Sequence, residues 1–237
     1  MPLVSIVLPS RNEIYLVKTV EDLLAKAAGP VEIIPVLDGY YPDPPLPDDK
    51  RVKILHRGKS RGMRAGINDA ALMATGEFLM KLDAHCMVSE GYDVALQQDC
   101  GDDTIVIPRR FSLDAEKWEP VKEAIDAHYL SYPFPRAAKP DEHRYHPQTG
   151  LHGGVWRERA RARKHILFDE EMSSQGSCYF LRKTYWDRVV GPLDIGSYGV
   201  FVQENQEVAN KVWLSGGSQM VDKRVWVHAG RHNNGRS

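Results

Sequence analysis

Long hydrophobic runs are missing from this sequence of 237 residues. It has no uninterrupted apolar stretch of about 18 residues, the length that a membrane-spanning helix needs. The first residues, Met1 to Leu3, lead straight into a strand-like segment and lack the charged region that opens a secretory signal. The sequence therefore predicts no stable membrane insertion and no signal peptide, and we expect a cytoplasmic protein.

Cysteine is scarce, and neither charge is in excess. The three cysteines, Cys86, Cys100 and Cys178, are far apart, which argues against a disulfide framework and a CxxC metal knuckle. The 31 basic and 32 acidic side chains give a net charge of −1, which excludes a uniformly basic nucleic-acid wrapper. With 42% hydrophobic and 27% charged residues, the composition is that of an ordinary globular protein.

Short apolar runs alternate with helical patterns in the first half of the chain. Four segments have the composition of strands: Val4–Pro9, Val31–Leu37, Val52–Leu55 and Phe78–Leu82. Two segments, 14–28 and 63–74, repeat apolar side chains at three- and four-residue spacing, as amphipathic helices do. This alternation predicts an α/β fold with a mostly parallel central sheet, in which ligands bind where the strands end.

The second half is less regular. Its patterns predict helices over 119–130, 183–190 and 203–214, and strands over 177–181 and 219–228. Residues 131–165 carry prolines, histidines and arginines without periodicity, which at this length predicts a functional or mobile loop. The sequence shows no internal repeat and no low-complexity linker, so we expect a single domain over residues 1–237.

The sharpest local feature is Asp83-Ala84-His85, a carboxylate and an imidazole two residues apart just after a predicted strand. One oxygen and one nitrogen ligand, together with diphosphate oxygens, suit Mn²⁺ or Mg²⁺ better than a structural zinc. The alternative to a metal site is that Asp83 only stabilises a turn and that His85 is hydrogen-bonded within the protein. The position at the ligand-binding end of the strand favours the metal site.

Four motifs in order resemble a known family. VSIVLPSRNE (residues 4–13), VLDG (36–39), RGMRAGINDAALMATG (61–76) and LDAHC (82–86) resemble the signatures of GT-A-fold glycosyltransferases of the family-2 superfamily. LDAHC is similar to the D-x-H motif of the polypeptide N-acetylgalactosaminyltransferases, and residues 198–231 resemble later motifs of that subgroup. The resemblance implies a GT-A (Rossmann-like) fold, with a nucleotide-binding half over 1–110 and an acceptor-binding half over 111–237.

The resemblance also implies a bound Mn²⁺ (or Mg²⁺) and a UDP-sugar donor. The metal ligands would be Asp83, His85 and His228, the last chosen over His232 because it ends a predicted strand. Asp38 would accept a hydrogen bond from the uracil imide, and Arg64 would face the donor. The full set of donor-binding residues would be Pro9, Asn12, Glu13, Asp38, Arg61, Arg64, Asp83 and Gly176.

The catalytic residues would be Glu204, Asn205 and Arg64. Inverting relatives carry Glu-Asp where this chain has Glu204-Asn205, and their aspartate deprotonates the acceptor. Because an amide cannot act as a base, either Glu204 takes that task or the enzyme retains configuration, which we favour. The alternative for Glu204 is a first-turn acid stabilised by the helix dipole.

These residues predict transfer of a hexose or N-acetylhexosamine from UDP to an acceptor hydroxyl. The acceptor would be a glycan, a protein hydroxyl or a hydroxymethylated pyrimidine in DNA. DNA is included because the basic run over 156–165 could bind phosphates. A degenerate nucleotide-sugar-binding module is a second possibility, because of Asn205. A nucleotidyltransferase is disfavoured, since the loop over 10–13 contains no glycine.

Overall fold

The segments expected as strands contribute to one mixed sheet in the computed structural model, which describes residues 1–131, 152–197 and 203–230. Of the expected strand 52–55, only Leu55 lies in a strand, and Val52 forms an isolated bridge with Ile33. The main sheet contains β1 (Val4–Ser10), β2 (Val31–Asp38), β3 (Leu55–Arg57), β4 (Phe78–Leu82), β5 (Cys86–Val88), β6 (Thr104–Asp114), β7 (Glu119–Ile125), β10 (Phe168–Glu170), β11 (Cys178–Arg182) and β12 (Ser218–Gly230). A second, two-stranded sheet pairs β8 (His128–Ser131) with β9 (His152–Val155).

The strand order in the main sheet is β10-β12-β6-β11-β4-β1-β2-β3, with β5 paired to β12 and β7 to β6. β1 lies between β2 and β4 and runs parallel to both, as β-strands joined by helical crossovers do. β11 is antiparallel and lies between β4 and β6. The expected α/β architecture with a mostly parallel sheet is confirmed.

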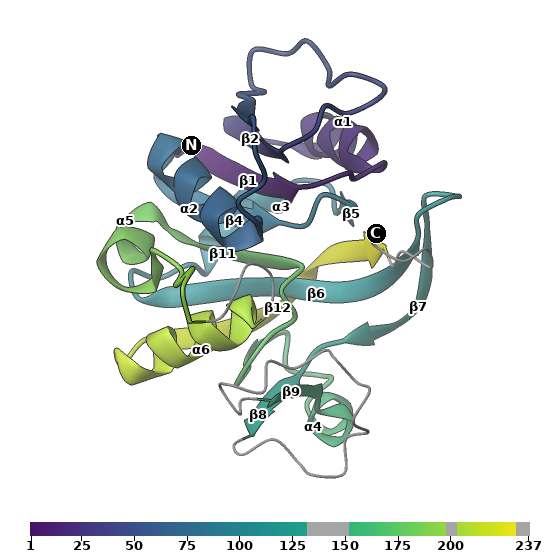
Figure 1. Ribbon diagram of the computed structural model, residues 1–237. Coiled ribbons are helices and arrows are strands. Elements are labelled where there is room, and N and C mark those ends of the chain that lie inside the picture. Colours follow the sequence, from purple (N-terminus) through teal and green to yellow (C-terminus); the bar gives the residue numbers. More distant parts are fainter. Residues whose placement is uncertain (132–151, 198–202, 231–237) are drawn as a thin grey trace, which may run out of the picture.

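Helices cover both faces of the sheet (Figure 1). They are α1 (Leu16–Lys26), α2 (Met63–Met73), α3 (Tyr92–Gln98), α4 (Arg157–Ala162), α5 (Lys183–Tyr185), the π-helical turn η1 (Trp186–Val190) and α6 (Glu204–Leu214). Alternation along β1 sends Ile6 and Leu8 into one core with α1 and α3, and Val7 into a second core with α2, η1 and α6.

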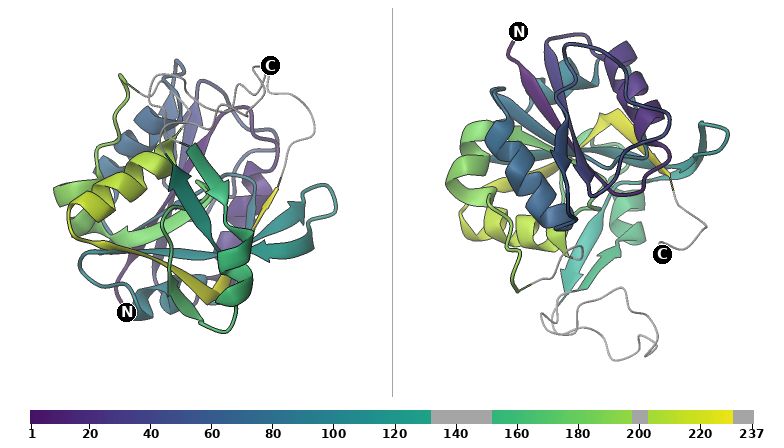
Figure 2. Two further views of the ribbon diagram at one scale, coloured as in Figure 1. Left: turned by 90° about the horizontal axis from the view of Figure 1, so that it is seen from below. Right: turned by 45° about the horizontal axis from the view of Figure 1, so that its top comes forward.

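Residues 119–130, expected as a helix, form strands, so that prediction is wrong. β7 pairs antiparallel with β6, and β8 starts at His128. Asp114 accepts hydrogen bonds from the backbone N–H groups of Glu116 and Lys117, and Trp118 has a φ of 57°, so the chain reverses into a hairpin. Pairing with β6 overrides the helical spacing, and the β6–β7 ribbon extends beyond the sheet (Figures 1 and 2).

The segment expected to be an irregular, mobile loop is in part regular. Within 131–165, residues 152–155 form β9 and residues 157–162 form α4, a short helix without a buried residue. Residues 132–151 lie outside the described part of the chain. β8, β9 and α4 lie together below the main sheet in the view of Figure 1.

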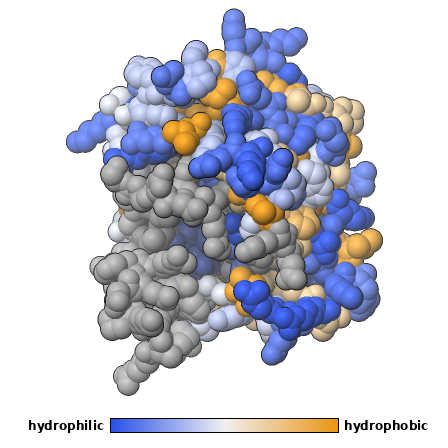
Figure 3. All heavy atoms as spheres, turned by 90° about the vertical axis from the view of Figure 1, so that its right-hand side faces the viewer, coloured by the Kyte–Doolittle hydropathy of each residue, from blue (hydrophilic) through white to orange (hydrophobic). Residues whose placement is uncertain are grey.

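The surface of the described residues is mixed in character. On the face shown in Figure 3, hydrophobic side chains form small groups scattered among hydrophilic ones. Within residues 1–131, 152–197 and 203–230, no helix has both the length and the apolar character needed to cross a membrane.

Glu32 on β2 makes the fold sensitive to acid. Burial alone would raise its pKa, but hydrogen bonds from Lys53, Ser5 and Thr75 outweigh burial and lower the pKa to about 2. A carboxylate with a depressed folded-state pKa stabilises the fold above its unfolded value, near 4.5, and loses this contribution as pH falls toward 2.

We therefore expect the stability advantage of the wild type over Glu32→Gln to narrow by about 3 kcal/mol as the pH falls from 6 to 2. Urea unfolding at several pH values measures this difference, with Glu90→Gln as an exposed control. A difference that stays constant over this pH range would contradict the assignment.

Candidate active site

The polar residues that follow the central strands meet at one edge of the sheet. β1, β2 and β4 are parallel, so Asp38 at the end of β2 and the loops that carry Glu13 and Asp83 lie on the same side of the sheet. Because β11 is antiparallel to β4, the segment that precedes it returns to this edge, and the N–H of Asp83 donates to the carbonyl of Ser177 at 2.8 Å. The structure thus brings the predicted metal motif beside the predicted Gly176 loop.

Asp83 and His85 lie side by side, and Glu13 holds the histidine. Nδ1 of His85 is 3.0 Å from Oε2 of Glu13, and Nε2 is 3.8 Å from Oδ2 of Asp83. A carboxylate at Nδ1 favours the tautomer whose proton is on Nδ1, which leaves the Nε2 lone pair on the side of Asp83. Glu13, expected to line a nucleoside site, is therefore a partner of His85.

This pair has the geometry of two ligands to one cation. Divalent ions lie roughly 2.1 Å from their ligands, so two ligating atoms 3.8 Å apart can share an ion. Burial raises the pKa of Asp83, but the charges of Lys81, His85 and Arg110 outweigh burial and hold that pKa below its usual value. Asp83 is accordingly an anion at neutral pH.

His228 does not join this pair in the structure. Its ring stacks on Phe111, with centroids 4.8 Å apart, and meets the edge of Trp226. Burial lowers its pKa, and its Nδ1 donates to the carbonyl of Ser112 at 3.3 Å. Among the residues that the structure describes, no three His, Cys, Asp or Glu side chains form a group that could hold a metal.

The predicted three-ligand site is thus not preassembled, because aromatic packing holds His228. Asp83 and His85 fit a divalent cation as a pair. Such a pair is sufficient for an ion that binds together with a nucleotide, because Mg²⁺ is usually bound by few protein ligands plus substrate phosphates.

Two buried charged side chains, Lys81 and Glu204, lie beside Asp83. Lys81 is 1% exposed, and its Nζ lies 2.7 Å from Oδ1 of Asp83 and 3.4 Å from Oε2 of Glu204. Burial raises the pKa of Glu204, although Lys81 acts in the opposite direction. The hydroxyl of Tyr179 on β11 also faces the Glu204 carboxylate and acts on its pKa in the same direction as Lys81. Glu204, in the first turn of α6, is therefore also part of the candidate site.

The neighbours of Glu204 shape the same corner. The side-chain amide of Asn205 donates to the carbonyl of Ser174, so Asn205 fixes the loop that leads to Gly176. A Cβ on Gly176 would lie 3.3 Å from Oε2 of Glu204, so this position favours the absence of a side chain. At the β1 end, Pro9 is half-buried, and Asn12 is exposed with a φ of 49°.

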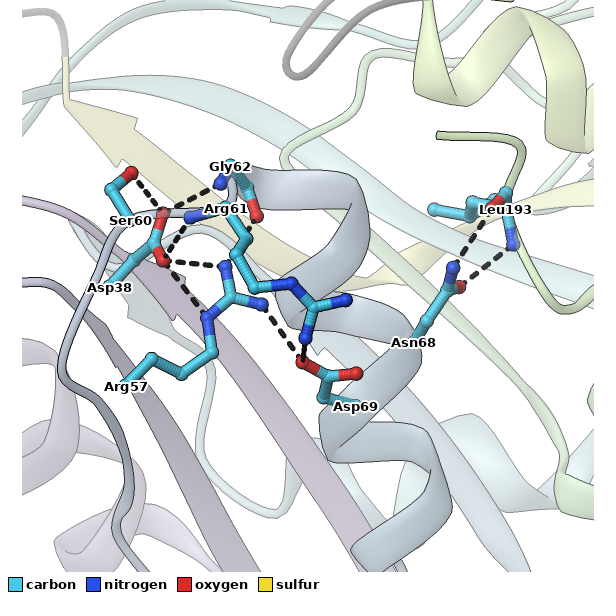
Figure 4. Close-up of polar contacts among 8 residues, drawn as sticks. All are labelled: Asp38, Arg57, Ser60, Arg61, Gly62, Asn68, Asp69 and Leu193. Carbon is cyan, nitrogen blue, oxygen red and sulfur yellow. Dashed lines mark hydrogen bonds and ion pairs between the residues drawn. The ribbon is translucent and has the colours of Figure 1, made fainter. Parts of the chain in front are cut away.

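Asp38 holds a loop together (Figure 4). Its carboxylate accepts hydrogen bonds from Nε and Nη2 of Arg57, the hydroxyl of Ser60, and the backbone N–H groups of Arg61 and Gly62. Burial raises the pKa of Asp38, but these donors outweigh burial and lower it.

A carboxylate offers about four acceptor positions, so the donors already present take up its capacity. This arrangement gives no support to the uracil contact expected of Asp38. It supports a structural role instead, in which Asp38 fixes the loop that leads into α2.

Arg64 lies away from the expected donor-facing position. Its side chain is fully buried, pairs with Glu207 of α6 and donates to the carbonyl of Asp194 at 2.9 Å. The guanidinium thus joins α2 to α6 and presents no exposed surface to a donor. Arg61, just before α2, is different, since its side chain is 57% exposed and its Nη1 lies 3.2 Å from Oδ2 of Asp69.

The comparison with protein families identifies this arrangement. The sequence profile described as "Glycosyl transferase family 2" matches residues 5–189. This chain belongs to glycosyl transferase family 2. The match covers the β1, β2 and β4 loops and the Gly176 loop, so the resemblance inferred from the four motifs is confirmed.

Two relatives of this family 2 protein show how far the likeness extends. "Polypeptide N-acetylgalactosaminyltransferase 5" of Caenorhabditis elegans is 28% identical over 172 residues, which cover 71% of this chain and 25% of that protein. The solved structure described as "Crystal structure of GalNAc-T7 with UDP, GalNAc and Mn2+" aligns with a TM-score of 0.72 and 16% identity. That alignment covers 99% of this chain and 45% of the other, so it shows the GT-A-like fold over less than half of the relative.

Two positively charged side chains of this family 2 protein's candidate site, Lys81 and Arg110, were not predicted from the sequence. Lys81 sits inside a hydrophobic strand segment, where a period-two pattern gave no sign of its ion pairs. Arg110 on β6 lowers the pKa of Asp83 from a distant part of the chain. Only the strand order, which places β11 beside β4 and β6 on the other side of β11, brings these groups together.

The basic run over 156–165 is partly neutralised. Arg163 forms hydrogen bonds of 2.6 to 2.9 Å with Asp169, and Arg159 donates to the carbonyl of Glu170 at 2.9 Å. Two of the arginines that would contact DNA phosphates therefore have internal partners. The structure gives DNA no advantage over other acceptors.

Proposed function

We propose that this family 2 protein is a metal-dependent glycosyltransferase that moves a hexose or N-acetylhexosamine from a UDP-sugar to an acceptor hydroxyl. The observation that carries the proposal is the line of contacts from Glu13 to His85 to Asp83 at the carboxyl ends of the central strands. The relative solved with UDP and Mn²⁺ has the same fold, which supports these two ligands.

Asp83 and His85 would hold Mn²⁺ or Mg²⁺. When bound, the cation would neutralise negative charge that builds on the departing diphosphate. Glu13 keeps the His85 ring in the orientation that turns Nε2 toward Asp83. Arg61, exposed beside the start of α2, is placed to attract the negatively charged donor.

Glu204 would be the carboxylate nearest the transferred sugar. Its buried carboxylate lies beside the Lys81 ammonium and the Tyr179 hydroxyl, and a sugar hydroxyl would be a further donor to it. Asn205 is engaged with the Ser174 carbonyl and cannot act as a base. The absence of a second carboxylate at position 205 supports transfer with retention of configuration.

Two measurements test the proposal. Titration calorimetry with UDP, with and without Mn²⁺, is expected to show binding that the metal strengthens. Mass spectrometry and NMR of products from a panel of UDP-sugars and acceptors would then give the sugar, the acceptor and the anomeric configuration. Metal-independent or absent UDP binding by folded protein would refute the proposed donor site, and turnover would distinguish an enzyme from a degenerate binding module.

Glu13→Gln is expected to weaken Mn²⁺ binding in the presence of UDP by about 10–100-fold, because partners behind a metal-binding histidine typically contribute this much. Glutamine keeps the size of the side chain but loses the charge that favours the required tautomer. Calorimetry measures the effect, and Glu21→Gln, an exposed change on α1, is the matched control. Equal Mn²⁺ affinities of the two variants would show that Glu13 does not support the metal site.

A further inference from the structure

Lys81 is a buried cation in the middle of the central sheet. It lies on β4, in register with Val7 of β1 and Tyr179 of β11, at a position where the neighbouring side chains are hydrophobic or aromatic. The side chain is 1% exposed. An ammonium in such a place costs free energy unless it is fully paired, so its partners indicate why a charge is present there.

The three partners of Lys81 come from three separate elements. Nζ contacts Oδ1 of Asp83 after β4, the carbonyl of Gly176 before β11, and Oε2 of Glu204 at the start of α6. An ammonium has three N–H donors, so these contacts match its full capacity. Each partner also belongs to the site proposed above.

The pairing assigns different tasks to the two oxygens of Asp83. Oδ1 is held by Lys81 at 2.7 Å, whereas Oδ2 faces Nε2 of His85 at 3.8 Å. Without the ammonium, the Asp83 side chain could rotate and repulsion from Glu204 would push it away. Lys81 therefore fixes both the direction of Asp83 and its distance from the Glu204 carboxylate.

We propose that Lys81 is a positioning residue for the metal site: it orients Asp83 toward His85 and ties the metal motif to Glu204 and the Gly176 loop. This inference rests on the proposed metal-dependent function. The competing explanation is that Lys81 merely neutralises the buried Glu204 and has no effect on the metal.

A set of variants separates the two explanations. Lys81→Met leaves Asp83 and Glu204 without their shared cation and carries a risk of misfolding. The double variant Lys81→Met/Glu204→Gln removes the buried charge of Glu204 as well. Glu204→Gln alone keeps the contact between Lys81 and Asp83. Lys211→Met, which removes a different lysine paired with Glu207, is the matched control.

The readout is the affinity for Mn²⁺ in the presence of UDP, measured by calorimetry or by the electron paramagnetic resonance of Mn²⁺, together with a urea unfolding curve. We expect Glu204→Gln and Lys211→Met to bind Mn²⁺ within about twofold of the wild type. The double variant should fold and bind Mn²⁺ at least about tenfold more weakly, the size typical of residues that orient metal ligands.

Equal Mn²⁺ affinity of the double variant and Glu204→Gln would overturn the proposal. Failure of the double variant to fold would also overturn it, because Lys81 would then be a structural residue. If the wild type itself bound no Mn²⁺ with UDP, the proposed function would fail first, so the two failures are distinguishable.

Discussion

Asp83→Asn is expected to abolish the Mn²⁺-assisted part of UDP binding and to lower turnover by about 10²–10³-fold, while the protein stays folded. The amide keeps the size of the side chain but loses the negative charge that a divalent cation requires. The ion pair of Lys81 with Oδ1 also depends on that charge.

Calorimetric titration with UDP at several Mn²⁺ concentrations measures this loss. Asp187→Asn is a suitable control, because Asp187 is an exposed carboxylate that pairs with Lys183 on the surface. The control should bind as the wild type does. If Asp83→Asn bound UDP with undiminished Mn²⁺ dependence, the metal would have to lie elsewhere.

Glu204→Gln is expected to lower turnover by about 10²–10⁴-fold, the usual range for a positioned acid or base, with little change in UDP affinity. Glu204 is 3% exposed, and its Oε2 lies 3.4 Å from the Lys81 ammonium. Glutamine fills the same space but cannot accept a proton or stabilise developing positive charge on the sugar. Single-turnover rates with saturating donor measure the chemical step.

Glu207, one turn further along α6, provides the contrast. It pairs with the fully buried Arg64, so Glu207→Gln should lower the free energy of unfolding by about 3–5 kcal/mol, the usual cost of breaking a buried ion pair. Its effect should appear in urea unfolding, whereas the effect of Glu204→Gln should appear in the rate. Two similar rate losses without a stability difference would contradict this division.

The strands and their loops could be predicted because local pattern determines them. The apolar runs at β1, β2 and β4 end where polar residues begin, and parallel strands place those ends together, so the pattern predicts that Asp83 and His85 lie at this end of the sheet. The contact of His85 with Glu13, which the resemblance implied only as a donor-binding residue, could not be predicted from the pattern. The helix predicted over 119–130 is wrong for the opposite reason. Its helical spacing competes with pairing to β6, and this long-range contact cannot be read from local spacing.

Side-chain roles were harder to predict than positions. Asp38 lies where expected, but donors from the loop over 57–62 occupy its carboxylate. Arg64 lies on α2 as expected, but its guanidinium points to Glu207 instead of a donor. These outcomes depend on which neighbouring elements supply partners, and the sequence gives no distance between such elements.

The antiparallel course of β11 has a consequence for engineering. The N–H of Asp83 is bound to the carbonyl of Ser177, so the backbones of the metal motif and the Gly176 loop are joined directly. A loop exchange over residues 174–177 that loses this hydrogen bond would also shift Asp83. Successful redesign of this loop would have to keep the Ser177 carbonyl in place and leave a glycine at position 176, whatever residues are changed around them.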